Sequence, residues 1–315
     1  MAGRRPIAAF ALSVVVASVA LLGGCRTAAI PIPERPTTSD AQQLATRGES
    51  IVRNVAVCGH CHAADAKRDP DGPLSGGMEF RNWRIGVARA SNLTNDSETG
   101  LGAWSEGEIV RALRNGVSRN GRLVNPVMPY EWFHRMSDDD AFAVAHYLKT
   151  LAPVRNHVTQ SPNLWYRIGR LLLLRPKPAL TSTAPPAGVT PEYGSYLANH
   201  VGLCADCHTQ RVGIRSAPDR KRLFAGMAKP PEGFPANPSN LTPDVETGIG
   251  RWSEADFVKA LRSGVTPDGR QLHPFMPWRQ NGRMSDDDLR AIYVYLRTLP
   301  PIRNVVPRKS NATAR

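Results

Sequence analysis

Two segments with the pattern Cys-x-x-Cys-His constrain what this chain can fold into, Cys58–His62 and Cys204–His208. Two thiols at this spacing can form thioethers with the two vinyl groups on one edge of a porphyrin, and the adjacent histidine can ligate the iron. A zinc site would need a second Cys/His pair nearby, and a redox dithiol needs no histidine at that position. We therefore predict two covalently bound haem c groups. Their predicted binding residues are Cys58, Cys61, His62, Cys204, Cys207 and His208.

The chain is an internal duplication, because the segments around the first motif return 146 to 148 residues later. Ser91–Thr94 returns as Ser239–Thr242, and Met136–Asp140 returns as Met284–Asp288. Each copy contains one Cys-x-x-Cys-His motif. We therefore expect each copy to form one haem domain.

The first residues have the features of a bacterial export signal. Arg4 and Arg5 are followed by the apolar run Ile7–Leu22. The closing residues Leu22–Cys25 resemble a lipobox, whose cysteine becomes the lipidated first residue of the mature protein. We expect lipidation at Cys25, which would tether an exported protein to a bacterial membrane on its periplasmic side. A plain cleaved signal or an uncleaved helix is the alternative.

These features divide the chain into six segments. We predict a lipoprotein signal peptide at 1–24, a tether at 25–39, a first haem domain at 40–156, a linker with an amphipathic helix at 157–190, a second haem domain at 191–305 and a C-terminal tail at 306–315. In the linker, apolar residues at helical spacing between Leu164 and Leu172 predict a helix that packs across the two domains. A helix that docks on a membrane or on a partner is the alternative.

Helical patterns recur in both copies. An apolar helix face around Ile51 leads into the first motif. Ser105 and Ser253 have the pattern of helix N-caps with an acidic third residue, and the last helix of each copy begins at Ser137 or Ser285. No convincing alternating strand pattern is present. The sequence therefore predicts an all-α, loop-rich fold.

A methionine loop in each copy is the candidate source of the second axial iron ligand. Met128 and Met276 each lie in Pro-x-Met-Pro, where the following proline keeps the methionine out of a helix and both prolines restrict the loop. A stiff loop can hold a thioether sulfur against a haem face. The predicted iron ligands are therefore His62, Met128, His208 and Met276.

Two other methionine pairs recur in the duplication. Met136 and Met284 directly precede a helix N-cap, where an apolar side chain packs on the first turn. Met78 and Met227 lie in glycine-flanked loops that are compatible with ligation or with packing. No histidine outside the motifs recurs at the same position in both copies, which excludes a symmetric bis-histidine arrangement.

The chain is basic, with 40 Lys and Arg against 27 Asp and Glu and a formal net charge of +13. Such an excess can bind nucleic acid, anionic lipid or an acidic protein partner. An exported chain does not meet nucleic acid, so we expect no nucleic-acid partner. Four of the five cysteines lie in the two motifs and the fifth is Cys25, so no disulfide is expected.

Taken together, the motifs resemble the cytochrome c subunits of bacterial membrane-bound alcohol and gluconate-type dehydrogenases. They comprise Cys-x-x-Cys-His, Asn-Leu-Thr with Glu-Thr-Gly, Trp-Ser-Glu, Pro-x-Met-Pro, Met-Ser-Asp-Asp-Asp and the Leu-Leu-Leu-Leu-Arg-Pro of the linker, over nearly all of residues 45–304. The resemblance implies two tandem class I-like cytochrome c domains with His/Met ligation. It also implies electron transfer from a dehydrogenase subunit toward quinone or a terminal oxidase, by a protein that is not itself an enzyme. Those subunits typically have three haem domains and no lipobox, so this chain departs from the pattern in both respects.

Two other functions remain as alternatives at this point. A dihaem peroxidase would need an iron with an open coordination position, which the paired methionine loops disfavour. A structural or haem-based sensing module would not exchange electrons with a donor on a useful timescale. No catalytic residue is predicted for the chain.

Overall fold

A computed structural model describes the protein over residues 30–36, 40–83, 85–213, 216–230, 234 and 236–307. The expected signal peptide at 1–24 and the expected lipidation site Cys25 lie outside the described residues. Among the residues that are described, no helix is both long and apolar enough to cross a membrane.

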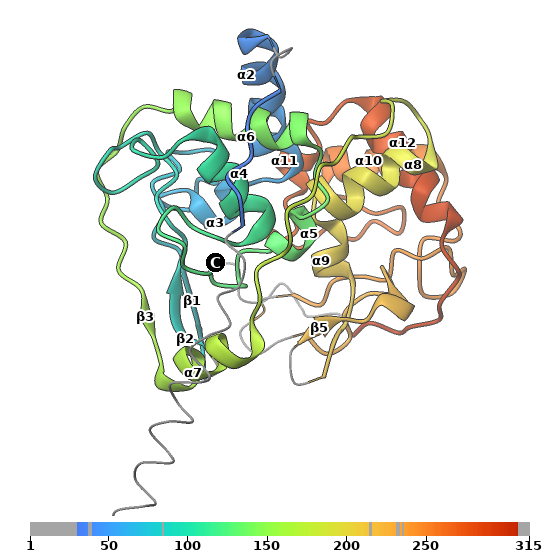
Figure 1. Cartoon of the computed structure of the whole chain (residues 1–315). Coiled ribbons are helices and arrows are strands. Elements are labelled where there is room, and N and C mark those ends of the chain that lie inside the picture. Colours follow the sequence, from blue (N-terminus) through green and yellow to red (C-terminus); the bar gives the residue numbers. More distant parts are fainter. Residues whose placement is uncertain are drawn as a thin grey trace, which may run out of the picture.

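The first copy is built mainly from helices and ordered loops (Figure 1). Its elements are, in chain order, α2 (Ala41–Ser50), the π-helical turn η1 (Ile51–Val55), α3 (Gly59–His62), β1 (Glu79–Asn82), β2 (Gly86–Arg89), α4 (Glu106–Asn115), α5 (Tyr130–Phe133) and α6 (Asp138–Thr150). The predicted N-caps are present, since the side chains of Ser105 and Ser137 accept backbone hydrogen bonds from the first turns of α4 and α6. Gly116 ends α4 with a left-handed φ of 70°.

The second copy repeats this order after a linker that contains β3 (Ser161–Pro162) and α7 (Leu164–Leu173). Its elements are α8 (Pro191–Tyr196), η2 (Leu197–Val201), α9 (Cys204–His208), β4 (Arg211–Val212), β5 (Ala217–Pro218), the 3-10 turn η3 (Arg220–Arg222), α10 (Glu254–Ser263), α11 (Trp278–Asn281) and α12 (Asp286–Thr298). The helices α4 and α6 of the first copy thus have counterparts of equal length in α10 and α12.

The prediction of an all-α fold is wrong, because the structure contains two small antiparallel sheets. β1, β2 and β3 pair in that order, with Glu79 opposite Arg89, and β4 pairs with β5. The hairpin of β1 and β2 is stabilised by ion pairs of Glu79 with Arg81 and Arg89. Strands this short and this charged carry no alternating apolar pattern, so periodicity does not reveal them. The fold is therefore mixed, with a helical core.

The first and last helices of each copy cross at a glycine. α2 packs on α6, and α8 packs on α12. A Cβ atom on Gly48 would collide with the carbonyl oxygen of Ala143, and one on Gly194 would collide with that of Ala291. The two backbones therefore approach each other more closely at these points than any side chain permits.

Replacing Gly48 or Gly194 by alanine should lower the free energy of unfolding by about 1–3 kcal/mol, because the crossing helices must separate to admit a methyl group. Denaturant unfolding of the holoprotein measures the change. Gly169→Ala in α7 is the control, since nothing lies within 4 Å of an added Cβ atom there. It should leave stability unchanged or raise it slightly. Wild-type stability in the Gly48→Ala variant would contradict the close helix contact.

The two copies pack on each other through matching elements. α5 of the first copy contacts η2 of the second, and α11 of the second copy contacts η1 of the first. A single apolar cluster includes residues of both copies, among them Phe142 and Leu148 of α6 and Leu289 and Leu296 of α12. Reciprocal contacts of this kind are typical of a two-fold symmetric interface, which here forms within one chain.

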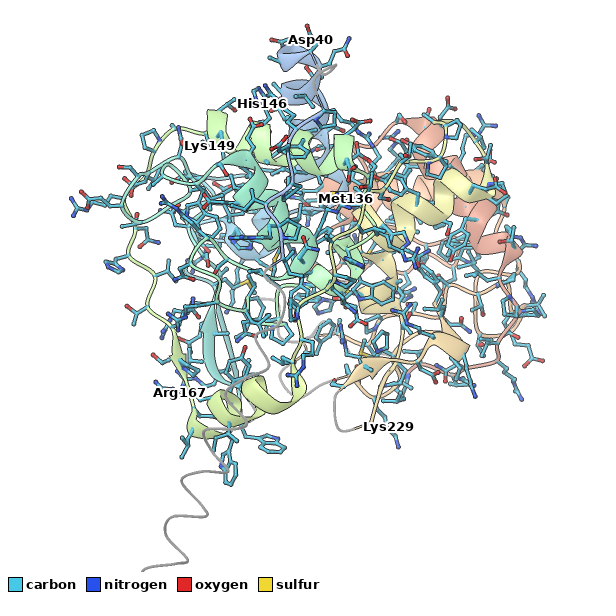
Figure 2. The ribbon with its side chains drawn as sticks, viewed as in Figure 1. Asp40, Met136, His146, Lys149, Arg167 and Lys229 are labelled. Atoms are coloured by element: carbon cyan, nitrogen blue, oxygen red, sulfur yellow. The ribbon has the colours of Figure 1, made fainter. Side chains whose placement is uncertain are left out.

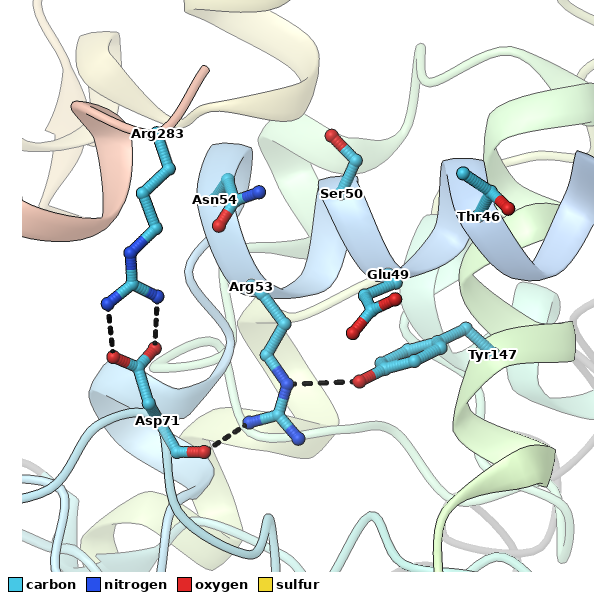
Figure 3. A pocket seen from close by; sticks show the side chains of 8 residues that line it. All are labelled: Thr46, Glu49, Ser50, Arg53, Asn54, Asp71, Tyr147 and Arg283. Carbon is cyan, nitrogen blue, oxygen red and sulfur yellow. Dashed lines mark hydrogen bonds and ion pairs between the residues drawn. The ribbon is translucent and has the colours of Figure 1, made fainter.

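Polar contacts join the copies beside this core. The Asn281 side chain donates to two backbone carbonyl groups of η1 at 2.8 and 3.1 Å. Arg283 donates two hydrogen bonds to the Asp71 carboxylate at 3.0 and 2.7 Å, at the edge of a polar pocket (Figure 3). These bonds hold the pKa of Asp71 below its usual value.

Arg53 lines the same pocket. Its guanidinium group donates hydrogen bonds to the Tyr147 hydroxyl and to the backbone carbonyl groups of Asp71 and Gly72.

A buried charge cluster lies where α2, α6 and α8 meet. Arg47 donates to both carboxylate oxygens of Asp140 at 2.7 and 2.9 Å, and the Tyr196 hydroxyl donates to the same carboxylate at 2.7 Å. Asp140 is only 5% exposed. Burial, followed by the Asp140 charge, raises the pKa of Tyr196. Because Tyr196 belongs to the second copy, the cluster joins the two copies.

Candidate haem-binding sites

Each Cys-x-x-Cys-His motif forms a short helix, α3 or α9. The chain enters both helices through a residue with a left-handed backbone, Val57 with φ 49° and Leu203 with φ 56°. A positive φ is costly for a residue with a branched side chain, and such strain persists only where the surrounding packing enforces it. The same strained backbone conformation therefore precedes the motif helix in both copies.

Both motif histidines are held in the same orientation. The Nδ1 atom of His62 lies 2.7 Å from the carbonyl oxygen of Ser91, and the Nδ1 atom of His208 lies 2.7 Å from the carbonyl oxygen of Ser239. A hydrogen bond to a carbonyl oxygen needs the proton on Nδ1, which leaves the Nε2 lone pair available to a metal. Burial lowers the pKa of both imidazoles and so favours the neutral ring that ligation requires.

The repeated Ser-Asn-Leu-Thr segment anchors the loop that supplies these carbonyl groups. The Asn92 side chain donates to the carbonyl oxygen of Val154 at 2.8 Å and accepts from the backbone N–H of Thr94 at 2.9 Å. Asn240 makes the same two contacts in the second copy. Ser91 and Ser239 contact the histidines through their backbone carbonyl groups, so the residue type serine does not predict this contact. In the sequence, only the repetition of the Ser-Asn-Leu-Thr segment in both copies indicates that the loop is important.

None of the four motif cysteines is joined in a disulfide. Burial raises the pKa of Cys58 to about 12 and the pKa of Cys61 and Cys204 to about 11, and it also raises the pKa of Cys207. A catalytic dithiol needs a lowered pKa, so these surroundings do not favour one. In the part of the chain that the structure describes, no three His, Cys, Asp or Glu side chains gather as metal ligands.

The two predicted methionine loops have the same conformation. The backbone N–H of Met128 donates to the carbonyl oxygen of Asn125, and that of Met276 donates to the carbonyl oxygen of His273, both at 2.9 Å. The prolines that follow have φ and ψ of −80° and 48° in the first copy and −78° and 47° in the second. Both methionines are half-buried and pack on the same apolar cluster as the first cysteine of each motif. The matched loop conformation and burial give the two methionines equivalent surroundings in the two copies.

The other methionine pairs have different surroundings. Met136, labelled in Figure 2, and Met284 are buried in the core in front of their helix N-caps. Met227 is buried whereas Met78 is half-buried, so this pair does not share one environment. Met128 and Met276, by contrast, lie in loops of the same conformation and are both half-buried.

Each motif also contacts the methionine-loop region of the other copy. Trp132 in α5 donates from Nε1 to the Asp206 carboxylate at 2.7 Å, between the two cysteines of the second motif. His60, between the two cysteines of the first motif, meets the ring of Phe275 edge to face with the ring centroids 4.9 Å apart. Burial and then the charge of Asp206 raise the pKa of Cys61 across the interface. His60 and Asp206 occupy the variable positions between the motif cysteines, so the sequence does not predict their contacts with the other copy.

The motif helix, the histidine bound to a carbonyl group and the crossing of the first and last helices define the class of protein as a c-type cytochrome. The Cytochrome c family model matches residues 45–152, within the first copy. The alcohol dehydrogenase (quinone) cytochrome c subunit of Gluconobacter oxydans is 31% identical over 83% of this chain and 56% of its own length. The gluconate 2-dehydrogenase cytochrome c subunit of Pantoea cypripedii is 31% identical over 81% of this chain and 59% of its own length. A diheme cytochrome c-type protein of Cereibacter sphaeroides is 31% identical over 85% of this chain and 92% of its own length.

The chain therefore belongs to the cytochrome c family, and the resemblance predicted from its motifs is confirmed. It spans less than two thirds of the length of the alcohol and gluconate dehydrogenase subunits, and nearly the whole length of the diheme protein. Covalent attachment of haem c through Cys-x-x-Cys-His is the family's way of binding its cofactor.

Proposed function

We propose that this chain carries two covalently bound haem c groups, one in each copy, and that it transfers electrons from a dehydrogenase subunit toward quinone or a terminal oxidase. The proposed domains are 40–156 and 191–305. The residues that would hold the two groups are Cys58, Cys61, His62 and Met128 in the first copy and Cys204, Cys207, His208 and Met276 in the second. The main support is the histidine geometry, in which Nδ1 lies 2.7 Å from a carbonyl oxygen in both copies.

The chain's own residues position and tune the cofactor, which supplies one-electron redox chemistry when bound. The serine carbonyl group in each copy fixes the tautomer and the ring orientation of the motif histidine. Met128 and Met276 would each offer a thioether sulfur to the iron, and a thioether ligand favours the reduced metal. Both features suit electron transfer rather than peroxide chemistry. We accordingly propose a carrier without catalytic activity of its own.

The packing of the copies supports electron passage within the chain. Trp132 links the first copy to the second motif, and Phe275 links the second copy to the first motif. Each motif therefore has a contact with the other copy at their interface. One of them can receive an electron from a donor while the other delivers one to an acceptor.

The proposed partners follow from the relatives and from the charge. Two of the three named relatives are cytochrome c subunits of dehydrogenases, so a dehydrogenase subunit is the proposed donor. The net charge of +13 favours an acidic docking surface or an anionic membrane. Lipidation of Cys25 would keep the protein on the periplasmic face of a membrane.

Haem content and spectroscopy of the purified holoprotein test the proposal. Two haems should remain attached after denaturation, and a reductive titration should consume two electrons per chain. The ferric protein should show low-spin iron and a charge-transfer band from methionine to iron. A single attached haem, or high-spin iron with rapid peroxide turnover, would contradict the proposal.

Substitution of the methionines tests the proposed ligands. Met128→Ala and Met276→Ala should each remove about half of the charge-transfer band, since each copy contributes one methionine ligand. Met78→Ala is the control, because it lies in a different loop and should leave the band intact. A full band in the Met128→Ala variant would exclude this residue as a ligand.

Trp132→Phe should slow electron exchange between the two sites and lower the free energy of unfolding by about 1–2 kcal/mol. The variant keeps an aromatic ring but removes the N–H that binds the Asp206 carboxylate. Exchange can be followed after rapid photoreduction, and stability by denaturant unfolding. Trp104→Phe is the control, since this half-buried tryptophan also packs on the apolar cluster. Equal effects of the two substitutions would count against a specific role of Trp132.

A further inference from the structure

The first two turns of the amphipathic helix α7 expose large apolar side chains to solvent. Leu164, Trp165 and Ile168 lie on one helix face and are 68%, 74% and 44% exposed. At these three residues the face does not pack across the two copies, contrary to the prediction; the side chains of Leu171 and Leu172 lie outside the described ones. The helix forms without burying these residues because the Asn163 side chain caps it, accepting from the backbone N–H of Tyr166 at 2.8 Å.

A second exposed tryptophan lies beside the start of this helix. β2 pairs with β3, and the Asn163 side chain donates to the carbonyl oxygen of Trp83 at 2.6 Å, which brings the tip of the β1–β2 hairpin to α7. Trp83 is 70% exposed. Figure 1 shows the hairpin and α7 at one end of the molecule, away from α8 and α12. We call the exposed apolar surface at this end the α7 patch; it consists of Trp83, Leu164, Trp165 and Ile168.

The surroundings of the α7 patch are basic. In sequence, segments 79–89 and 157–177 contain seven Lys or Arg and a single acidic residue, Glu79. Arg81 and Arg89 pair with Glu79, and Lys177 pairs with Glu131 of α5. Arg167 is exposed at the same end of the molecule (Figure 2). An acidic protein surface would complement the charge but would not need a continuous apolar helix face. Tryptophan, aliphatic side chains and arginine on one surface helix are typical of a helix that lies in the interface between lipid and water.

We propose that the α7 patch inserts into the interfacial layer of an anionic lipid bilayer, with Arg167 binding lipid phosphate groups. Tryptophan rings favour the headgroup level of a bilayer, and leucine and isoleucine side chains reach the acyl boundary below it. This contact goes beyond electron transfer and does not depend on an acyl chain at Cys25. It would hold the hairpin end of the first copy against the membrane and so give the two sites a defined orientation relative to it.

Vesicle cosedimentation tests the proposal, using the exported holoprotein that begins at Arg26 so that no acyl chain contributes. The wild-type protein should bind vesicles of phosphatidylcholine with phosphatidylglycerol, and bind pure phosphatidylcholine vesicles more weakly. The double variant Trp165→Ser/Ile168→Ser should bind the anionic vesicles more than tenfold more weakly, because it loses two large apolar side chains. Arg167→Gln should lose about fivefold on the anionic vesicles and little on the neutral ones.

A matched control removes exposed apolar side chains elsewhere. Val245 and Val305 are exposed in the second copy, and the double variant Val245→Ser/Val305→Ser should bind vesicles like the wild type. Unchanged haem content and thermal unfolding establish that each variant is folded. Wild-type protein that binds neither vesicle, or that binds no better than the α7 variant, overturns the proposal. So does an α7 variant that binds vesicles normally but no longer copurifies with a dehydrogenase subunit, because the patch is then a protein interface.

Discussion

Replacing Cys204 and Cys207 together by serine should leave a holoprotein with one covalently attached haem instead of two. Each motif is expected to hold its own cofactor, because the two motif helices lie in separate copies and each has its own carbonyl-bound histidine. The absorbance that survives denaturation should fall to about half of the wild-type value. Quantitative haem analysis and the mass of the intact chain measure the loss.

The matched control for this experiment is the same substitution in the first copy. Cys58→Ser/Cys61→Ser should also leave one attached haem, and the two double variants should differ in which redox transition survives. Substitution of all four cysteines should abolish covalent attachment. If either double variant retains two attached haems per chain, one motif is not an attachment site.

Asp140→Ala should lower the free energy of unfolding by about 3 kcal/mol. The substitution leaves Arg47 without its bidentate partner and removes the charged acceptor of the buried Tyr196 hydroxyl, which keeps the Ser137 hydroxyl at 3.0 Å. Removing one partner of a buried ion pair costs about 3–5 kcal/mol, and the lower end applies here because Arg47 is partly exposed. Denaturant unfolding of the holoprotein measures the change. The transition should also lose cooperativity, since the cluster joins the two copies.

The duplication provides the control for Asp140→Ala. Asp288 occupies the same place at the start of α12, but the position equivalent to Arg47 is Tyr193, so no comparable ion pair forms there. Asp288→Ala should cost less than about 1 kcal/mol, the contribution of an acidic residue near a helix N-terminus. Equal losses in the two variants would show that helix capping, and not the cluster, accounts for the effect.

Features encoded by residues close together in the sequence could be predicted without a structure. The N-caps Ser105 and Ser253, the last helices that begin after Ser137 and Ser285, and the left-handed end of α4 all depend on a few consecutive residues. The membership in the cytochrome c family likewise follows from short motifs and their spacing. The strands were missed because β1 and β2 depend on cross-strand pairs of Glu79 with arginines, which have no signature of apolar periodicity.

The sequence by itself determined the two Cys-x-x-Cys-His motifs, their duplication and the paired methionine loops, because each is written in a short run of residues. Only the tertiary structure decided that Ser91 orients His62, that Trp132 reaches Asp206 in the other copy, and that the first two turns of α7 expose their apolar side chains. These are contacts, or missing contacts, between segments far apart in the chain. The geometry of these contacts depends on how the two copies and the linker pack. A local pattern of residue types does not predict that packing.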